Sequence, residues 1–87
     1  MSRARTPAEV ALWANIPRSL ASLVCTVAER HGITMAAMRG DSRAHRFVVA
    51  RRELAQEATA AGFGSPTIGR ALNRDHSTVL HHLKTAA

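Results

Sequence analysis

The sequence has one cysteine, few aromatic residues and few acidic ones. Cys25 is the only cysteine among 87 residues, so no intramolecular disulfide can form. Its apolar neighbours, Leu23, Val24 and Val27, indicate a small core residue in a reducing compartment. Aromatic residues make up only 3% of the chain, although 46% of it is hydrophobic. Because β-sandwiches favour β-branched and aromatic residues, this composition predicts short, closely packed helices instead.

Long apolar runs are absent as well. No segment approaches the ~18 apolar residues that a membrane-spanning helix requires. Pro17 and Arg18 interrupt the segment after the basic start "MSRAR", so no signal-peptide core is expected. No Gly-x-x-x-x-Gly-Lys-Ser/Thr loop occurs, which excludes a P-loop ATPase within these residues. We therefore expect one cytoplasmic domain with no membrane association and no cofactor.

Basic residues outnumber acidic ones by 12 to 6, which gives a net charge of +6. An excess of this size on so small a domain attracts polyanions, nucleic acid above all. The charge therefore favours a nucleic-acid partner.

Helical signals occupy the whole chain. "TPAE" at 6–9 is a capping box that predicts a helix from Pro7, ending before Pro17. Helical spacing of apolar residues predicts a second helix that contains Leu20–Ala28 and is closed by "HG" at 31–32. Thr34 is the expected cap of a single helical turn. Similar apolar spacing predicts a longer helix that contains Phe47–Ala61 and is closed by Gly62. No segment alternates as a strand should, so the predicted fold is an all-α helical bundle.

The segment "SPTIGRALNRDHSTVLHHLK" predicts a helix-turn-helix. Ser65 is the expected N-cap and Pro66 the first residue of one helix, Asn73 takes a positive φ in the turn, and Asp75 caps a second helix that begins at about His76. In this motif the second helix presents its first turn to the major groove. The side chains of Asp75, His76, Ser77 and Thr78 suit the donors, acceptors and thymine methyl groups of base edges.

Catalytic and metal-binding alternatives fit this segment less well. Consecutive residues on a helix diverge by about 100°, so Asp75, His76 and Ser77 cannot converge as a catalytic triad. His76 and His81 are five residues apart, whereas helical metal ligands favour a spacing of about four. We therefore predict neither an enzyme nor a metal site. His81 and His82 are expected to lie on a solvated helix face or to contact phosphate.

A second basic segment spans residues 39–52, where five arginines face only Asp41 as an acidic residue. Its first part is a loop beside the helix-turn-helix, from which arginine could enter a narrow A·T-rich minor groove. Arg51 and Arg52 begin the long helix and are predicted to contact phosphates.

Three stretches, "TVAERHGIT", "SRAHRFVVARRELAQEA" and "SPTIGRALNRDHSTVLHHLK", resemble the C-terminal DNA-binding domain of the bacterial replication initiator DnaA. The resemblance covers residues 24 to 85. The resemblance implies a TrpR-like helix-turn-helix domain at 24–87, preceded by a helical extension at 1–23. It also assigns roles to individual residues. The implied roles are base contacts for Asp75, His76, Ser77 and Thr78, a minor-groove contact for Arg43, and phosphate contacts for Arg51, Arg52, Ser65, Pro66, Arg74 and Lys84. Asn73 replaces the family's usual pair of glycines, and Asp41 lies in the basic loop. Both departures bear on which DNA sequence is preferred.

The resulting hypothesis is a monomeric, nucleoid-associated, sequence-specific double-stranded DNA-binding module that regulates transcription in a bacterium or phage. One alternative is a replication modulator that occupies initiator boxes. Another is protein docking through residues 1–23, although the basic 39–52 segment disfavours it. The abrupt end "KTAA" also suggests a longer regulator, with a C-terminal region as a further site for partners.

Overall fold

A computed structural model describes residues 6–74 and 76–85, apart from the side chains of residues 13, 76 and 82–85. Within these residues the chain forms helices and no strand. The helices are α1 (Pro7–Ala14), α2 (Arg18–Arg30), α3 (Met35–Arg39), α4 (His45–Ala60), α5 (Ser65–Leu72) and α6 (His76–Thr85). The predicted all-α fold and the predicted order of its helices are confirmed.

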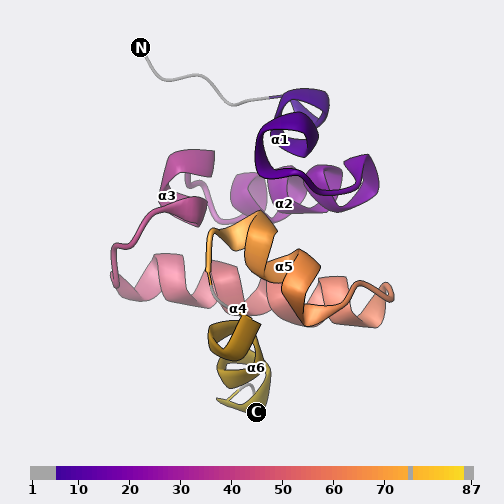
Figure 1. The fold of residues 1–87 in the computed structure, drawn as a ribbon. Helices are drawn as coiled ribbons and strands as arrows, with labels where there is room; N and C mark the ends of the chain where they lie inside the picture. Colours follow the sequence, from indigo (N-terminus) through magenta and orange to yellow (C-terminus); the bar gives the residue numbers. More distant parts are fainter. Residues whose placement is uncertain (1–5, 75, 86–87) are drawn as a thin grey trace.

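The long helix α4 crosses the middle of the molecule. Helices α1 and α2 lie above it and α6 lies below it in Figure 1, while α5 contacts α2, α4 and α6. The largest fully buried side chains come from all of the helices and form one core, and they are Val10, Leu20, Val24, Val27, Met38, Leu54, Ile68, Leu72 and Val79. Burying apolar surface of this kind is the main force that holds such short helices together.

The N-terminal helix α1 is part of the same core. Its predicted capping box is present, because Thr6 Oγ1 accepts the Glu9 amide at 3.2 Å and Glu9 Oε1 accepts the Thr6 amide at 3.1 Å. Arg70 Nε donates to the Asn15 carbonyl at 3.0 Å, which connects the end of α1 to α5. The boundary expected after residue 23 falls inside α2, between the buried side chains of Leu20 and Val24.

Most helix ends follow the sequence, with two exceptions. Arg51 and Arg52, which were expected to begin the long helix, lie in the middle of α4, because that helix already begins at His45. Gly32 and Gly62 follow α2 and α4, the helices that they were predicted to close, and both take a left-handed backbone, with φ of 65° and 100°. The predicted N-cap at Ser65 is wrong. The Ile68 amide donates to the Gly64 carbonyl at 3.0 Å, so α5 begins one residue earlier, with Gly64 as its N-cap and Ser65 in its first turn.

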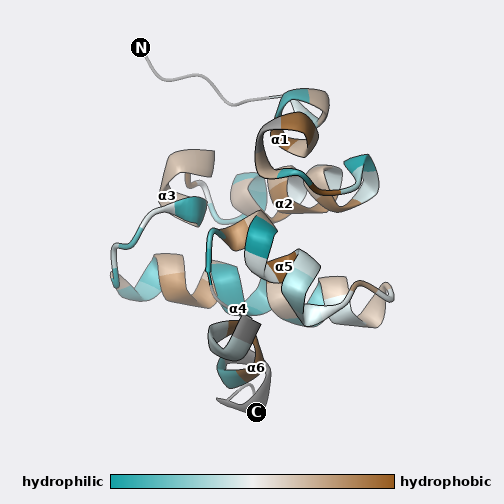
Figure 2. Cartoon of the chain, viewed as in Figure 1, coloured by the Kyte–Doolittle hydropathy of each residue, from teal (hydrophilic) through white to brown (hydrophobic). Residues whose placement is uncertain are grey.

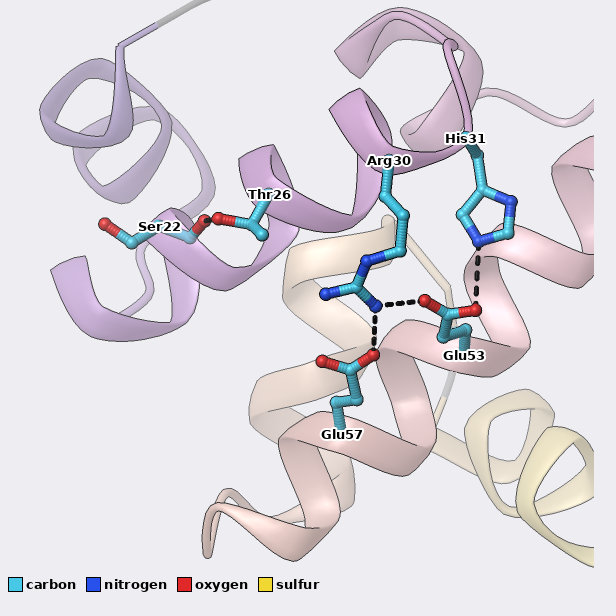
Figure 3. Close-up of polar contacts among 6 residues, drawn as sticks. All are labelled: Ser22, Thr26, Arg30, His31, Glu53 and Glu57. Carbon is cyan, nitrogen blue, oxygen red and sulfur yellow. Dashed lines mark hydrogen bonds and ion pairs between the residues drawn. The ribbon is translucent and has the colours of Figure 1, made fainter.

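An ion-pair group connects the end of α2 to α4 (Figure 3). The Arg30 guanidinium pairs with the carboxylates of Glu53 and Glu57, and His31 Nε2 lies 3.0 Å from Glu53 Oε1. On α2 itself, the Thr26 hydroxyl donates to the Ser22 carbonyl at 2.9 Å. The two glutamates are four residues apart and therefore lie on the same side of α4.

Figure 2 colours the end of α3 and the turn after α5 as hydrophilic, whereas α1 carries a hydrophobic stretch. Among the described residues, no helix combines the length and the apolar character needed to cross a membrane.

Candidate nucleic-acid interface

Helices α5 and α6 form the predicted helix-turn-helix. Asn73 ends α5 with a φ of 56°, the left-handed conformation predicted for it. The Arg74 amide then donates to the Gly69 carbonyl at 2.7 Å, which closes the turn. Gly69 is buried, as expected for a small residue where two helices approach closely, and α5 and α6 are in contact. Val79 is fully buried, so the adjacent residues of α6 face outward or along its edges.

The structure describes part of the predicted base-contacting set. Ser77 is exposed and Thr78 is half-buried in the first turn of α6. Asp75 lies outside the described residues, as do the side chains of His76 and Lys84. The exposed His81 and half-exposed Leu80 follow on the same helix.

Arg43 lies in loop 40–44, the segment between α3 and α4, and its side chain is exposed. His45 and Arg46 follow it in the first turn of α4 and are exposed too. The Arg46 guanidinium stacks over the Phe47 ring, 4.9 Å from its centroid, where a cation–π interaction is favourable. Arg43 of the loop and the first turn of α4 therefore present basic side chains to the solvent, next to the exposed Asp41.

Arg51 has a different role from the one predicted. It is only 2% exposed, and its guanidinium makes four hydrogen bonds to main-chain carbonyls of α3 and loop 40–44. The acceptors are the carbonyls of Met38 at 3.0 Å, Ser42 at 2.7 Å, Ala37 at 2.8 Å and Gly40 at 3.0 Å. The predicted phosphate contact through this side chain is therefore not supported, because the guanidinium is buried and its N–H groups already donate to main-chain carbonyls.

Two more arginines make the same kind of contact nearby. Arg39 donates to the last carbonyls of α5, from Nε to Ala71 at 3.0 Å and from Nη2 to Arg70 at 2.9 Å. Arg74 donates to the Leu72 carbonyl at 3.2 Å and to the Gly40 carbonyl, which it shares with Arg51. We call Arg39, Arg51, Arg74 and these carbonyls the arginine–carbonyl cluster. It joins loop 40–44 to the turn of the helix-turn-helix.

The electrostatics of the cluster follow from its burial. Burial lowers the pKa of Arg51, the nearby charge of Arg74 lowers this pKa further, and Asp41 opposes both effects. Burial also lowers the pKa of Arg39. Since arginine ordinarily titrates far above neutral pH, both side chains remain charged, and the carbonyl oxygens replace the water that burial removes.

The other residues predicted to contact phosphate are placed as follows. Arg52 is half-buried, and its Nε has no hydrogen-bond partner within the part of the chain that the structure describes. Ser65 and Pro66 form the first turn of α5, where Gly64 provides no side-chain cap for the free amides. These amides and the dipole of α5 favour a bound anion.

Sequence reasoning missed the cluster, although one signal was present. Arg51 lies three residues before Leu54 and seven before Ala58, which are both buried, so helical spacing puts it on the inner stripe of α4. Gly40 also matters for the cluster, because its position leaves no room for a side chain: a Cβ at this residue would lie only 2.8 Å from the Ala36 carbonyl oxygen. Its role depends on this three-dimensional approach and could not be predicted from the sequence.

Comparison with known proteins identifies a family. The family described as the bacterial DnaA protein helix-turn-helix matches residues 20–85, which is well over half of the chain. Neither the curated proteins nor the solved structures include a significant match. The matched region contains both the helix-turn-helix and loop 40–44. Among the side chains that the structure describes, which do not include those of His76 and His82, no group of three or more histidine, cysteine or acidic residues could hold a metal ion.

Proposed function

Because the chain belongs to the bacterial DnaA helix-turn-helix family, a DNA-binding module, we propose that it binds specific double-stranded DNA sites as a monomer and regulates transcription. The observation that carries the proposal is the hydrogen-bonded connection between loop 40–44, which carries the exposed Arg43, and the turn that precedes α6. A protein that contacts a major groove and the adjacent minor groove needs these two elements at a fixed separation. The proposed activity is binding, without catalysis or a cofactor.

Base contacts in the major groove are assigned to Asp75, His76, Ser77 and Thr78. A carboxylate accepts from cytosine N4, an imidazole donates or accepts, and a threonine methyl group packs against the thymine methyl group. The exposure of Ser77 and the outward edge position of Thr78 support this assignment.

Contacts outside the major groove are divided between the loop and the helix ends. Arg43 is proposed to enter the minor groove, where narrow A·T-rich segments concentrate negative potential. The proposed phosphate contacts involve Arg52, Ser65, Pro66, Arg74 and Lys84. Arg74 keeps further N–H donors for a phosphate while it binds its internal carbonyls, because a guanidinium carries five.

A second candidate function is the occupation of replication-initiator boxes in competition with the initiator itself. It is supported by the sequence "RDHSTV" at 74–79, which lies in the matched region. Chromatin immunoprecipitation in the native host separates the two candidates, because transcription predicts bound promoters and replication control predicts a bound origin.

DNA binding itself is tested by selecting bound duplexes from a random pool and measuring affinity for the selected site. Thr78→Ala should cost about 1–3 kcal/mol on that site and little on random DNA, as expected for a base contact. An equal loss on both DNAs would contradict the assigned role of Thr78. Failure to enrich any sequence would contradict the proposed function.

A further inference from the structure

The geometry points to Arg51 as a positioning residue that fixes the conformation of loop 40–44 and thereby sets where Arg43 lies relative to α6. This inference rests on the proposed function for its consequence on DNA. The structural claim, that Arg51 orders the loop, concerns the free protein and is testable without DNA.

The contacts of Arg51 bracket the loop. Its Nη2 donates to the Gly40 carbonyl at 3.0 Å and its Nη1 to the Ser42 carbonyl at 2.7 Å, immediately before Arg43. Its Nε and Nη2 also bind the Met38 and Ala37 carbonyls at 3.0 and 2.8 Å, and these belong to α3. One buried side chain therefore binds the loop at two carbonyls and also binds α3, so it fixes the position of the loop relative to that helix.

The same loop is connected to the turn before α6. The Gly40 carbonyl accepts from Arg74 as well as from Arg51. Asn73 Nδ2 donates to the Arg39 carbonyl at 3.4 Å, and the Arg39 side chain returns to the end of α5. The loop with the proposed minor-groove residue and the turn that leads into the proposed major-groove helix thus share hydrogen bonds.

The chemistry requires arginine at this position. A planar guanidinium has five N–H donors in a rigid fork, and four main-chain acceptors around it are satisfied together. A lysine ammonium has three donors on a flexible stem and cannot reach all four acceptors with the same geometry. A neutral, apolar side chain of similar length would satisfy none of them.

The test compares Arg51→Met with Arg52→Met, a matched control one residue along the same helix. Circular dichroism and thermal melting first establish that each variant folds. Fluorescence anisotropy at fixed salt then gives affinities for two duplexes that differ only in an A·T or G·C flank beneath loop 40–44. Nitrogen-15 relaxation gives the backbone order of residues 40–44 in the absence of DNA. Arg51→Lys is measured alongside, because it keeps the charge and the stem if the methionine variant does not fold.

We expect wild-type backbone order parameters of about 0.85 in loop 40–44, falling towards about 0.6 in Arg51→Met and less far in Arg51→Lys. We also expect the ratio of the affinities for the A·T and G·C duplexes to fall to within about twofold in Arg51→Met. For comparison, a tenfold ratio corresponds to ~1.4 kcal/mol. Arg52→Met should weaken binding equally on both duplexes and leave the order of the loop unchanged.

An ordered loop and a retained A·T preference in a folded Arg51 variant would overturn the inference. So would equal effects of the Arg51 and Arg52 substitutions on the flank preference. If the wild-type protein binds no DNA or shows no flank preference, the proposed function or the assigned role of Arg43 fails. The relaxation data still decide whether Arg51 orders the loop.

Discussion

Arg51, which belongs to α4, and Arg30, which ends α2, are both held by hydrogen bonds, but by acceptors of different charge. Arg51 donates to neutral main-chain carbonyls, whereas Arg30 pairs with the carboxylates of Glu53 and Glu57. Residues 51 and 53 are two positions apart on a helix, so their side chains leave α4 in nearly opposite directions. The same helix therefore orders an arginine on each side, with opposite results for the local charge.

The difference determines where the positive charge of the molecule remains. Carbonyl acceptors satisfy the N–H groups of an arginine without cancelling its charge, so Arg39, Arg51 and Arg74 add to the field around loop 40–44. The two carboxylates more than offset the single positive charge of Arg30. A count of arginines along the sequence treats these residues alike, although only those in the arginine–carbonyl cluster still attract a polyanion.

Gly40→Ala should have the largest effect, because it disturbs the carbonyl side while leaving the carboxylate side intact. The new Cβ would lie 2.8 Å from the Ala36 carbonyl oxygen, so the main chain must shift at the carbonyl that Arg51 and Arg74 share. We expect the free energy of unfolding to fall by about 1–3 kcal/mol, as for other overpacked sites. Chemical denaturation followed by circular dichroism measures it.

Gly64→Ser is the matched control for this substitution. A Cβ at Gly64 meets only the Pro66 Cδ, at 3.7 Å, and serine is a favourable N-cap for α5. Its stability should be equal to that of the wild type or higher. Equal losses in the two variants would mean that the approach to Ala36 does not constrain residue 40.

Removing one arginine from each side compares their contributions to DNA affinity. Arg74→Ala removes a charge that faces carbonyls and is proposed to contact phosphate, so the salt dependence of binding should flatten by about one in log–log slope on every sequence. Arg30→Ala removes a charge that carboxylates already cancel, and its slope should match the wild type. Titrations at several salt concentrations give both slopes.

A change of slope in Arg30→Ala as large as that in Arg74→Ala would break the comparison. It would show that total charge, not the charge near the proposed interface, controls binding. An unchanged slope in Arg74→Ala would remove this residue from the proposed phosphate contacts.

Local signals predicted most of the fold. The capping box at Thr6, the cap at Thr34, the left-handed Asn73 and the apolar stripe of α2 each depend on residues within a few positions of one another, and each is present. The N-cap of α5 was misplaced by one residue because glycine and serine both suit that position.

The arginine–carbonyl cluster was not predicted, for a physical reason. Its acceptors are main-chain carbonyls, which every residue has, and Arg39 and Arg70 come together only through the packing of α3 on α5. An arginine in a basic segment was therefore assigned to phosphate, although the position of Arg51 on the buried stripe of α4 was visible in the sequence. Conflict between charge and helical spacing was the available signal.

The smallest expected effect comes from the carboxylate side and depends on pH. The hydrogen bond from Arg30 lowers the pKa of Glu53 below its ordinary value of 4.5, burial opposes this change, and His31 contributes in the same direction as Arg30. A carboxyl group whose pKa is lower in the folded state stabilises the fold above its unfolded pKa, and this stabilisation is lost as the pH falls through the folded value. Glu53→Gln should therefore lower the thermal midpoint slightly at neutral pH, and the two proteins should converge as the pH falls through the lowered pKa of Glu53. Glu29→Gln, which alters an exposed glutamate on α2, serves as the control and should show no such convergence. A difference between wild type and Glu53→Gln that stays constant from neutral pH into acid would show that the charge of Glu53, which pairs with Arg30 and His31 in Figure 3, is not its cause.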